Sequence, residues 1–313
     1  METNKFYRIA LVAGAMAAAV SCSKKSYEPI SINSRVAVKF CSGISQLQSR
    51  VSGTLGTNWD ANDPIGIYMI GASGALTTAN LLEEGDNLQY KAASAGTDVD
   101  FNAVGNSLFY PASGDVKFVA YYPYSASVGS DFKLPISVAA QTSQSAIDVL
   151  YAPAGTSYSK QSVGSTAVAL PFVHKLVKLA FTISAGDGVD AASLSGLVLK
   201  IGGQQSAGTL DLATGTVTAT VGTPTQITAL TAANGLSSEA IVLPGSTSVV
   251  SLTFTASGVT YTGSITSGAT SWDGGYRYPY NITLNSSGVD VDVVGGTISP
   301  WNDADFTSLS YSE

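Results

Sequence analysis

Residues 116–124 read Val-Lys-Phe-Val-Ala-Tyr-Tyr-Pro-Tyr, a run of β-branched and aromatic side chains. Such side chains fit the pleated, half-buried surface of a β-sheet. The run is also shorter than the helices that globular proteins usually contain. The stretch therefore predicts a buried strand.

The same kind of pattern recurs on both sides of this strand. Val36, Val38 and Phe40 alternate with more polar or smaller residues, which is the period of a strand with one buried face. Residues 210–220 predict a hairpin with Gly215 at its turn. Many short strands separated by turn residues are typical of β-sandwiches and barrels, so we expect an all-β protein. Further strands are expected at 249–254, 259–265, 276–284 and 289–298.

Composition excludes several classes of protein. The chain has 313 residues, which is enough for about two domains, and its 45% apolar content argues against disorder. Only 12% of the residues are charged and the formal net charge is −7, so the chain has no basic surface for nucleic acid. It contains one histidine, His174, which nearly excludes histidine-based catalysis.

The first residues predict an export signal. Lys5 and Arg8 precede an apolar run over residues 9–20, which is too short to span a bilayer and fits a secretory signal peptide. The following Ser21-Cys22 completes a sequence that resembles a bacterial lipobox, although its first position is Ala19 where Leu is commoner. We expect residues 1–21 to be the signal peptide, with cleavage between Ser21 and Cys22.

In a lipobox the thiol of the cysteine is acylated. Cys22 would then carry acyl chains such as palmitate, and residues 22–34 would form a lipidated linker that tethers the protein to a membrane without a transmembrane helix. An ordinary signal peptide with an incidental cysteine is the alternative.

Seven landmarks follow this signal in a fixed order, and together they resemble the fimbrillin-like family of Bacteroidota. The resemblance implies two tandem transthyretin-like, Greek-key β-sandwich domains, which we place at 35–170 and 171–313. It also implies a subunit of a surface fimbria, or pilus, that is an outer-membrane lipoprotein before assembly and supports adhesion. The landmarks are residues 56–59 with 63–68, 109–111, 118–124, 148–152, 172–176, 280–284 and 298–301.

The resemblance further implies assembly by donor-strand exchange. A protease cuts after an arginine behind the first strand, the strand leaves, and a strand of another fimbrial subunit fills the groove. Here the removable strand would be residues 35–44, with Val36, Val38 and Phe40 on its buried face. Cleavage is expected between Arg50 and Val51, because Arg50 is the one arginine in the connector.

Other residues leave alternatives open. The C-terminal segment 301–313 is either a donor strand or a closing edge strand. Trp59, Trp272 and Trp301 raise the alternative of a monomeric surface lipoprotein that binds glycans, and a receptor of the fimbria could be a glycan or a protein.

Acidic residues give little reason to expect an enzyme or a metalloprotein. The run Asp60-Ala61-Asn62-Asp63 begins like a calcium loop but lacks the later ligands of an EF-hand, so a turn is the better interpretation. We therefore assign no catalytic residue, metal or cofactor. Carboxylate pairs at 83/84, 290/292 and 303/305 are interpreted as solvated surface, and His174 as a structural hydrogen-bonding residue.

Overall fold

A computed structural model of the chain describes residues 35–42, 58–82, 84–163, 166–246, 249–266, 271–293 and 299–300. Regular structure in these ranges is almost entirely strand, which confirms the all-β expectation. The helical segments are single turns, and none of the described helices is long and apolar enough to cross a membrane. They are α1 (Gln144–Ile147), α2 (Lys160–Val163) and the 3-10 turn η1 (Ala191–Leu194).

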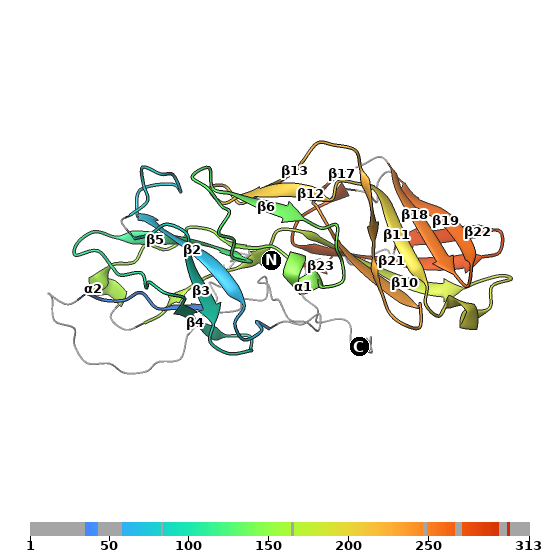
Figure 1. Cartoon of the computed structure of the whole chain (residues 1–313), viewed down its shortest axis with the longest axis horizontal. Coiled ribbons are helices and arrows are strands. Elements are labelled where there is room, and N and C mark those ends of the chain that lie inside the picture. The colour runs from blue at the N-terminus through green and yellow to red at the C-terminus, as the bar shows by residue number, and fades with distance from the viewer. Residues whose placement is uncertain are drawn as a thin grey trace, which may run out of the picture.

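The first half of the chain forms an eight-stranded sheet in the order β8-β1-β4-β3-β2-β5-β7-β9 (Figure 1). Strand β1 is antiparallel to β4 and parallel to β8, and the other neighbours are antiparallel. The strands are β1 (Phe40–Ser42), β2 (Pro64–Gly71), β3 (Leu88–Ala92), β4 (Val99–Ala103), β5 (Val116–Tyr122), β7 (Leu150–Ala152), β8 (Val168–Ala169) and β9 (Val173–His174). Strand β5 is the strand expected from residues 116–124.

Alternate residues of this sheet enter two different cores. On β2, Ile65, Ile67 and Met69 pack into a core that contains only residues of the first half. Tyr68 and Ile70, on the opposite side of the same strand, join a second core that continues into the second half. The first sheet is therefore covered by apolar contacts on both faces.

The second half of the chain contains two sheets that share this second core. One sheet has the order β15-β16-β10-β21-β22, and the other has the order β14-β11-β18-β19. Their strands are β10 (Val177–Ala185), β11 (Val198–Gln204), β14 (Thr225–Thr228), β15 (Leu230–Thr231), β16 (Ser237–Val242), β18 (Val249–Ala256), β19 (Val259–Thr266), β21 (Tyr276–Asn285) and β22 (Gly288–Val293). Short strands β17 (Gly245–Ser246) and β20 (Ser271–Trp272) pair with each other, and β23 (Ser299–Pro300) pairs with β21.

Both late hairpins expected from the sequence are present. Strand β18 pairs with β19, and β21 pairs with β22 through the turn that ends at Gly288. Residues 294–298 of the last expected strand lie outside the described residues.

A further sheet, of three strands, joins the two halves. It has the order β13-β12-β6, and its strands are β6 (Lys133–Ser137), β12 (Ala207–Asp211) and β13 (Thr216–Ala219). The β12–β13 pair is the hairpin expected at 210–220, and Gly215 in its turn has a φ of 72°. In sequence, β6 precedes the expected boundary near residue 170 and the hairpin follows it. The boundary itself stays a prediction.

The hairpin is packed tightly against the first half. Leu210 and Leu212 are completely buried, and the Tyr151 hydroxyl on β7 donates to the Leu212 carbonyl oxygen at 3.0 Å. A Cβ atom on Gly215 would lie 2.5 Å from Cε1 of the Tyr151 ring. Glycine is therefore required at this turn by its backbone angle and by the ring beside it.

Gly215→Ala should lower the free energy of unfolding by roughly 1–3 kcal/mol more than Gly196→Ala. Of these two positions, only Gly215 would bring the added methyl group into a steric clash, with the Tyr151 ring. Gly196 is a matched control, since its φ is 73° and a Cβ atom added to it would have nothing within 4 Å. Urea unfolding of both variants measures the difference. Equal losses would show that the Tyr151 contact does not constrain the turn.

Candidate functional site at the first strand

Residues 35–42, called here the first segment, lie within the first sheet rather than at its rim. Phe40 is opposite Phe101 on β4 and opposite Val168 on β8. The residues that follow Phe40 continue both pairings, with Cys41 opposite Asp100 and Ala169. The segment thus fills the gap between β4 and β8.

Backbone hydrogen bonds extend beyond β1 itself. The Val38 amide donates to the Leu108 carbonyl at 2.8 Å, and the Tyr110 amide donates to the Val36 carbonyl at 3.0 Å. On the other edge, the amides of Val168 and Leu170 donate to carbonyl oxygens of the segment, those of Lys39 at 2.7 Å and Cys41 at 2.9 Å. Both edges of the first segment are therefore hydrogen-bonded.

Its side chains follow the expected alternation as far as Phe40, after which Cys41 and Ser42 are both buried. Val38 is 4% exposed and Phe40 1% exposed, whereas Ala37 and Lys39 face solvent. Val36 is partly buried and packs against the same core. The structure thus places all three predicted residues of the removable strand on its inner face.

Phe40 is the main apolar anchor of the segment. Its ring meets Tyr90 and Phe118 edge to face, with centroids 5.1 Å and 5.0 Å away. The Tyr90 hydroxyl in turn accepts a hydrogen bond from the Leu108 amide at 2.8 Å, which fixes the ring. Burying a phenylalanine contributes on the order of 1.5–3 kcal/mol, so this side chain dominates the contact.

The Arg35 side chain, at the start of the segment, makes only surface contacts. Arg35 pairs with Glu84 at 2.6 Å, and its guanidinium lies 4.1 Å from the centre of the Phe109 ring. Both charged side chains are more than half exposed, and exposed pairs contribute about 0–1 kcal/mol. Breaking the Arg35 contacts at the start of the segment therefore costs little free energy.

The position of the first segment could be taken by another extended peptide. Without the first segment, β4 and β8 would present unpaired backbone groups beside a groove lined by Tyr90, Phe118 and Leu108. An extended peptide with apolar side chains at alternate positions can supply both the hydrogen bonds and the side chains.

The other site residues expected from the sequence are not covered by the structure. Ser21 and Cys22, the cleavage pair Arg50 and Val51, and the segment 301–313 lie outside the described residues. Signal cleavage, lipidation and maturation cleavage therefore stay predictions.

The single histidine is engaged inside the protein, as expected. His174 on β9 is 8% exposed, and its Nδ1 lies 2.8 Å from Oδ2 of Asp148, which is 3% exposed. Strand β9 pairs with β7 next to this contact, with Leu150 opposite His174. The pair ties the end of the first sheet to the residue that follows α1.

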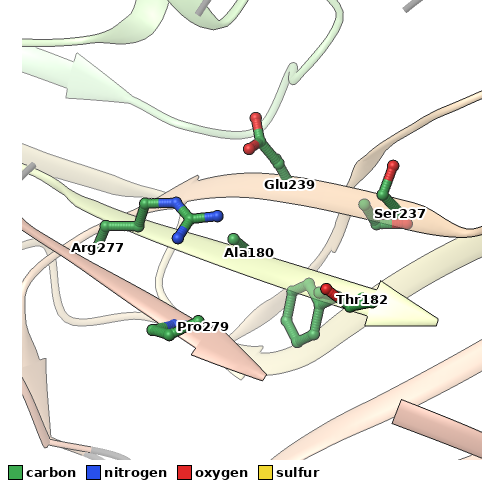
Figure 2. A pocket seen from close by; sticks show the side chains of 8 residues that line it. Ala180, Thr182, Ser237, Glu239, Arg277 and Pro279 are labelled. Carbon is green, nitrogen blue, oxygen red and sulfur yellow. The ribbon is translucent and has the colours of Figure 1, made fainter. Parts of the chain in front are cut away.

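A small pocket in the second half is lined by polar and apolar side chains of β10, β16 and β21 (Figure 2). Glu239 and Arg277 project on the same side of these strands, and Glu239 forms an ion pair with Lys178, Nζ to Oε2 3.1 Å. All three charged residues are buried. The Ser237 hydroxyl has no hydrogen-bond partner among the described residues. The space accommodates about one water molecule, so it is not a site for a larger ligand.

The run Asp60–Asp63 forms the turn expected before β2. The Asp60 amide donates to Oδ2 of Asp63 at 2.8 Å, and Asn62 has a φ of 74°. Burial raises the pKa of Asp63 to about 6, the hydrogen bond from Asp60 lowers it, and the Asp60 charge raises it further. The described residues contain no group of three or more side chains suited to hold a metal ion.

Two of the three tryptophans are core residues. Trp59 is completely buried and Trp272 is 2% exposed, while Trp301 lies outside the described residues. Tyr121 and Tyr122 are buried as well. Trp59 and Trp272 therefore offer no ring surface to a sugar.

Comparison with known proteins gives a consistent result. A family model described as fimbrillin-like matches residues 49–301. A candidate fimbrium subunit, Fim1C of Bacteroides uniformis, is 35% identical over 273 residues, which cover 84% of this chain and 85% of that protein.

Solved structures have the same architecture. A candidate cell adhesion protein from Bacteroides uniformis has a TM-score of 0.69 and 31% identity, and the match covers 86% of this chain and 98% of that one. A candidate cell adhesion protein from Bacteroides ovatus has a TM-score of 0.60 and 20% identity over 86% of this chain and 96% of that one, which supports the fold alone.

The Asp63 environment predicts a dependence of stability on pH. The folded-state pKa of about 6 lies above the ordinary value of 3.8, so the folded protein binds this proton more tightly than the unfolded chain. The resulting stability is fully present below about pH 4 and is lost as the pH rises through 6. Asp63→Asn should remove this component while keeping an acceptor for the Asp60 amide.

The melting temperatures of the wild type and of Asp63→Asn should therefore diverge between about pH 4 and pH 7, with the wild type losing more as the pH rises. A difference that stays constant over this range would contradict the assignment.

Proposed function

This chain belongs to the fimbrillin-like family, and from that premise we propose that it is a fimbrial subunit assembled by exchange of its first strand. The family relationship places it among fimbrial and cell adhesion proteins. The proposal concerns how such a subunit is exported, processed and joined to other subunits.

One observation carries the proposal, namely the position of the first segment. It is hydrogen-bonded on both edges and buries Val38 and Phe40, yet its beginning is held by an exposed ion pair. A segment of this kind completes a sheet and can be replaced by another strand of the same pattern.

Processing would open the groove. Cleavage between Arg50 and Val51 would free residues 35–44, and a strand from the next subunit would take their place. The segment 301–313 is the candidate donor, because Phe306, Leu309 and Tyr311 give it apolar side chains. Joining one surface to a different surface of the next copy gives an open filament.

Export would precede assembly. The signal peptide of residues 1–21 directs the chain out of the cytoplasm, and acylation of Cys22 holds it at the outer membrane until the fimbria forms. The partners are then other fimbrial subunits, and the exposed fimbria contacts a glycan or protein receptor.

The described residues favour neither alternative function. A monomeric glycan-binding lipoprotein would use exposed tryptophan rings, but Trp59 and Trp272 are buried. A histidine-dependent hydrolase needs an accessible base, but His174 is buried against Asp148. We therefore assign no catalytic role.

Arg50→Ala should leave export intact and prevent polymer formation, because the first segment could not be released. The readout is the ladder of SDS-resistant polymers from cells that express the variant. Arg35→Ala is the matched control, since it removes an arginine whose ion pair is exposed, and it should polymerise normally. A normal ladder from Arg50→Ala would overturn the choice of cleavage site.

Cys22→Ala should abolish incorporation of labelled palmitate, since the acyl chains would have no attachment point. The wild-type chain, labelled in parallel, is the control. Palmitate labelling retained in Cys22→Ala would refute the lipid anchor.

A further inference from the structure

The sheet β13-β12-β6 connects parts of the chain that are far apart in sequence. Five consecutive residues of β6, from Lys133 to Ser137, face the five residues of β12. The ladder is extended at both ends, where the Leu212 amide donates to the Phe132 carbonyl at 2.9 Å and the Val138 amide to the Ser206 carbonyl at 2.8 Å. The two halves are thus joined by hydrogen bonds as well as by the chain itself.

Side chains reinforce both sides of this ladder. Lys133 forms an ion pair with Asp211 across the β6–β12 rung. The Tyr151 hydroxyl on β7 donates to the Leu212 carbonyl, and the turn at Gly215 lies directly under the Tyr151 ring. The hairpin is therefore fixed to two strands of the first half.

Gln141 provides a second connection, to β16. Its Nε2 donates to the Ile241 carbonyl at 2.9 Å, and its Oε1 accepts from the Ile241 amide at 2.9 Å. The same Nε2 donates to the Val138 carbonyl at 2.7 Å, and the residue is 4% exposed. One side chain thus satisfies both backbone groups of Ile241, as a neighbouring strand would.

The direction of these strands matters for mechanics. In Figure 1 the two halves lie at opposite ends of the long axis, and β6, β12 and β13 run roughly along that axis between them. A pull along the axis therefore loads the β6–β12 rungs in shear. Bonds loaded in shear share the force, whereas bonds at the end of a hairpin open one at a time.

We propose that the β6–β12–β13 sheet and the Gln141 side chain form a mechanical clamp that carries tension between the two halves of the subunit. The proposal rests on the fimbrial role argued above, since a fimbria transmits force from one subunit to the next. It does not depend on strand exchange, because the clamp lies within a single chain.

Single-molecule force spectroscopy on the full chain tests the clamp. Short peptide tags for enzymatic coupling are inserted after Gly105 and after Gly258, exposed turn residues in different halves. In the wild type, both halves should unfold in one rupture event, with the full length between the tags released together.

Gln141→Ala should shorten the lifetime at constant force about tenfold, because the buried backbone groups of Ile241 would lose their partners. Asn234→Ala is the matched control. It removes a bond of the same type as that to the Ile241 amide, from the Leu236 amide to Oδ1 at 3.0 Å, in an exposed turn outside the clamp. Its lifetime should equal that of the wild type.

If Gln141→Ala does not fold, Tyr151→Phe provides a milder change, since it keeps the ring and removes only the bond to Leu212. It should shorten the lifetime several-fold. Two separate ruptures in the wild type, or equal lifetimes for the clamp variant and the Asn234 control, would overturn the proposal. Such a result would leave the assembly tests with Arg50 and Cys22 unaffected.

Discussion

Backbone N–H and C=O groups at the edge of a strand need partners, and this requirement organises the whole molecule. Between β4 and β8 the partners come from the first segment. Between the halves they come from the β6–β12 ladder, and at Ile241 they come from the Gln141 side chain. Each of these contacts closes an edge that would otherwise accept a strand from another chain. The proposed assembly uses the one closure that a single cut could remove.

The interior holds two pairs of ionisable side chains, although charged residues are scarce in the chain. Lys178 is paired with Glu239, and His174 with Asp148, and all four are buried. Removing one member of such a pair is costly because the other stays buried without compensation. Both pairs link strands or segments close to the contact between the halves. They add directional constraints to a core that is otherwise apolar, and each pair joins neighbouring segments of a single sheet.

Local sequence patterns predict where the strands lie better than they predict which strands pair with each other. Alternation at 36–40 identified the buried face of the first segment, and Gly215 identified the hairpin turn. The pairing of β6 with β12 was not predictable, because alternation reports which face is buried and not which distant strand lies alongside. Gln141 carried no signal at all, since its role depends on Ile241, a residue remote in sequence. The tryptophans were ambiguous for a similar reason, because burial is decided by tertiary packing.

The proposed assembly requires that the first strand be removed when the subunit joins a fimbria. Intact mass and N-terminal sequencing of the protein in material sheared from the cell surface test this removal directly. If the strand is removed, the mature chain begins at Val51 and lacks residues 35–44. A chain that begins at an acylated Cys22, with no shorter form in the sheared material, would contradict it and would favour an anchored subunit whose first strand stays in place.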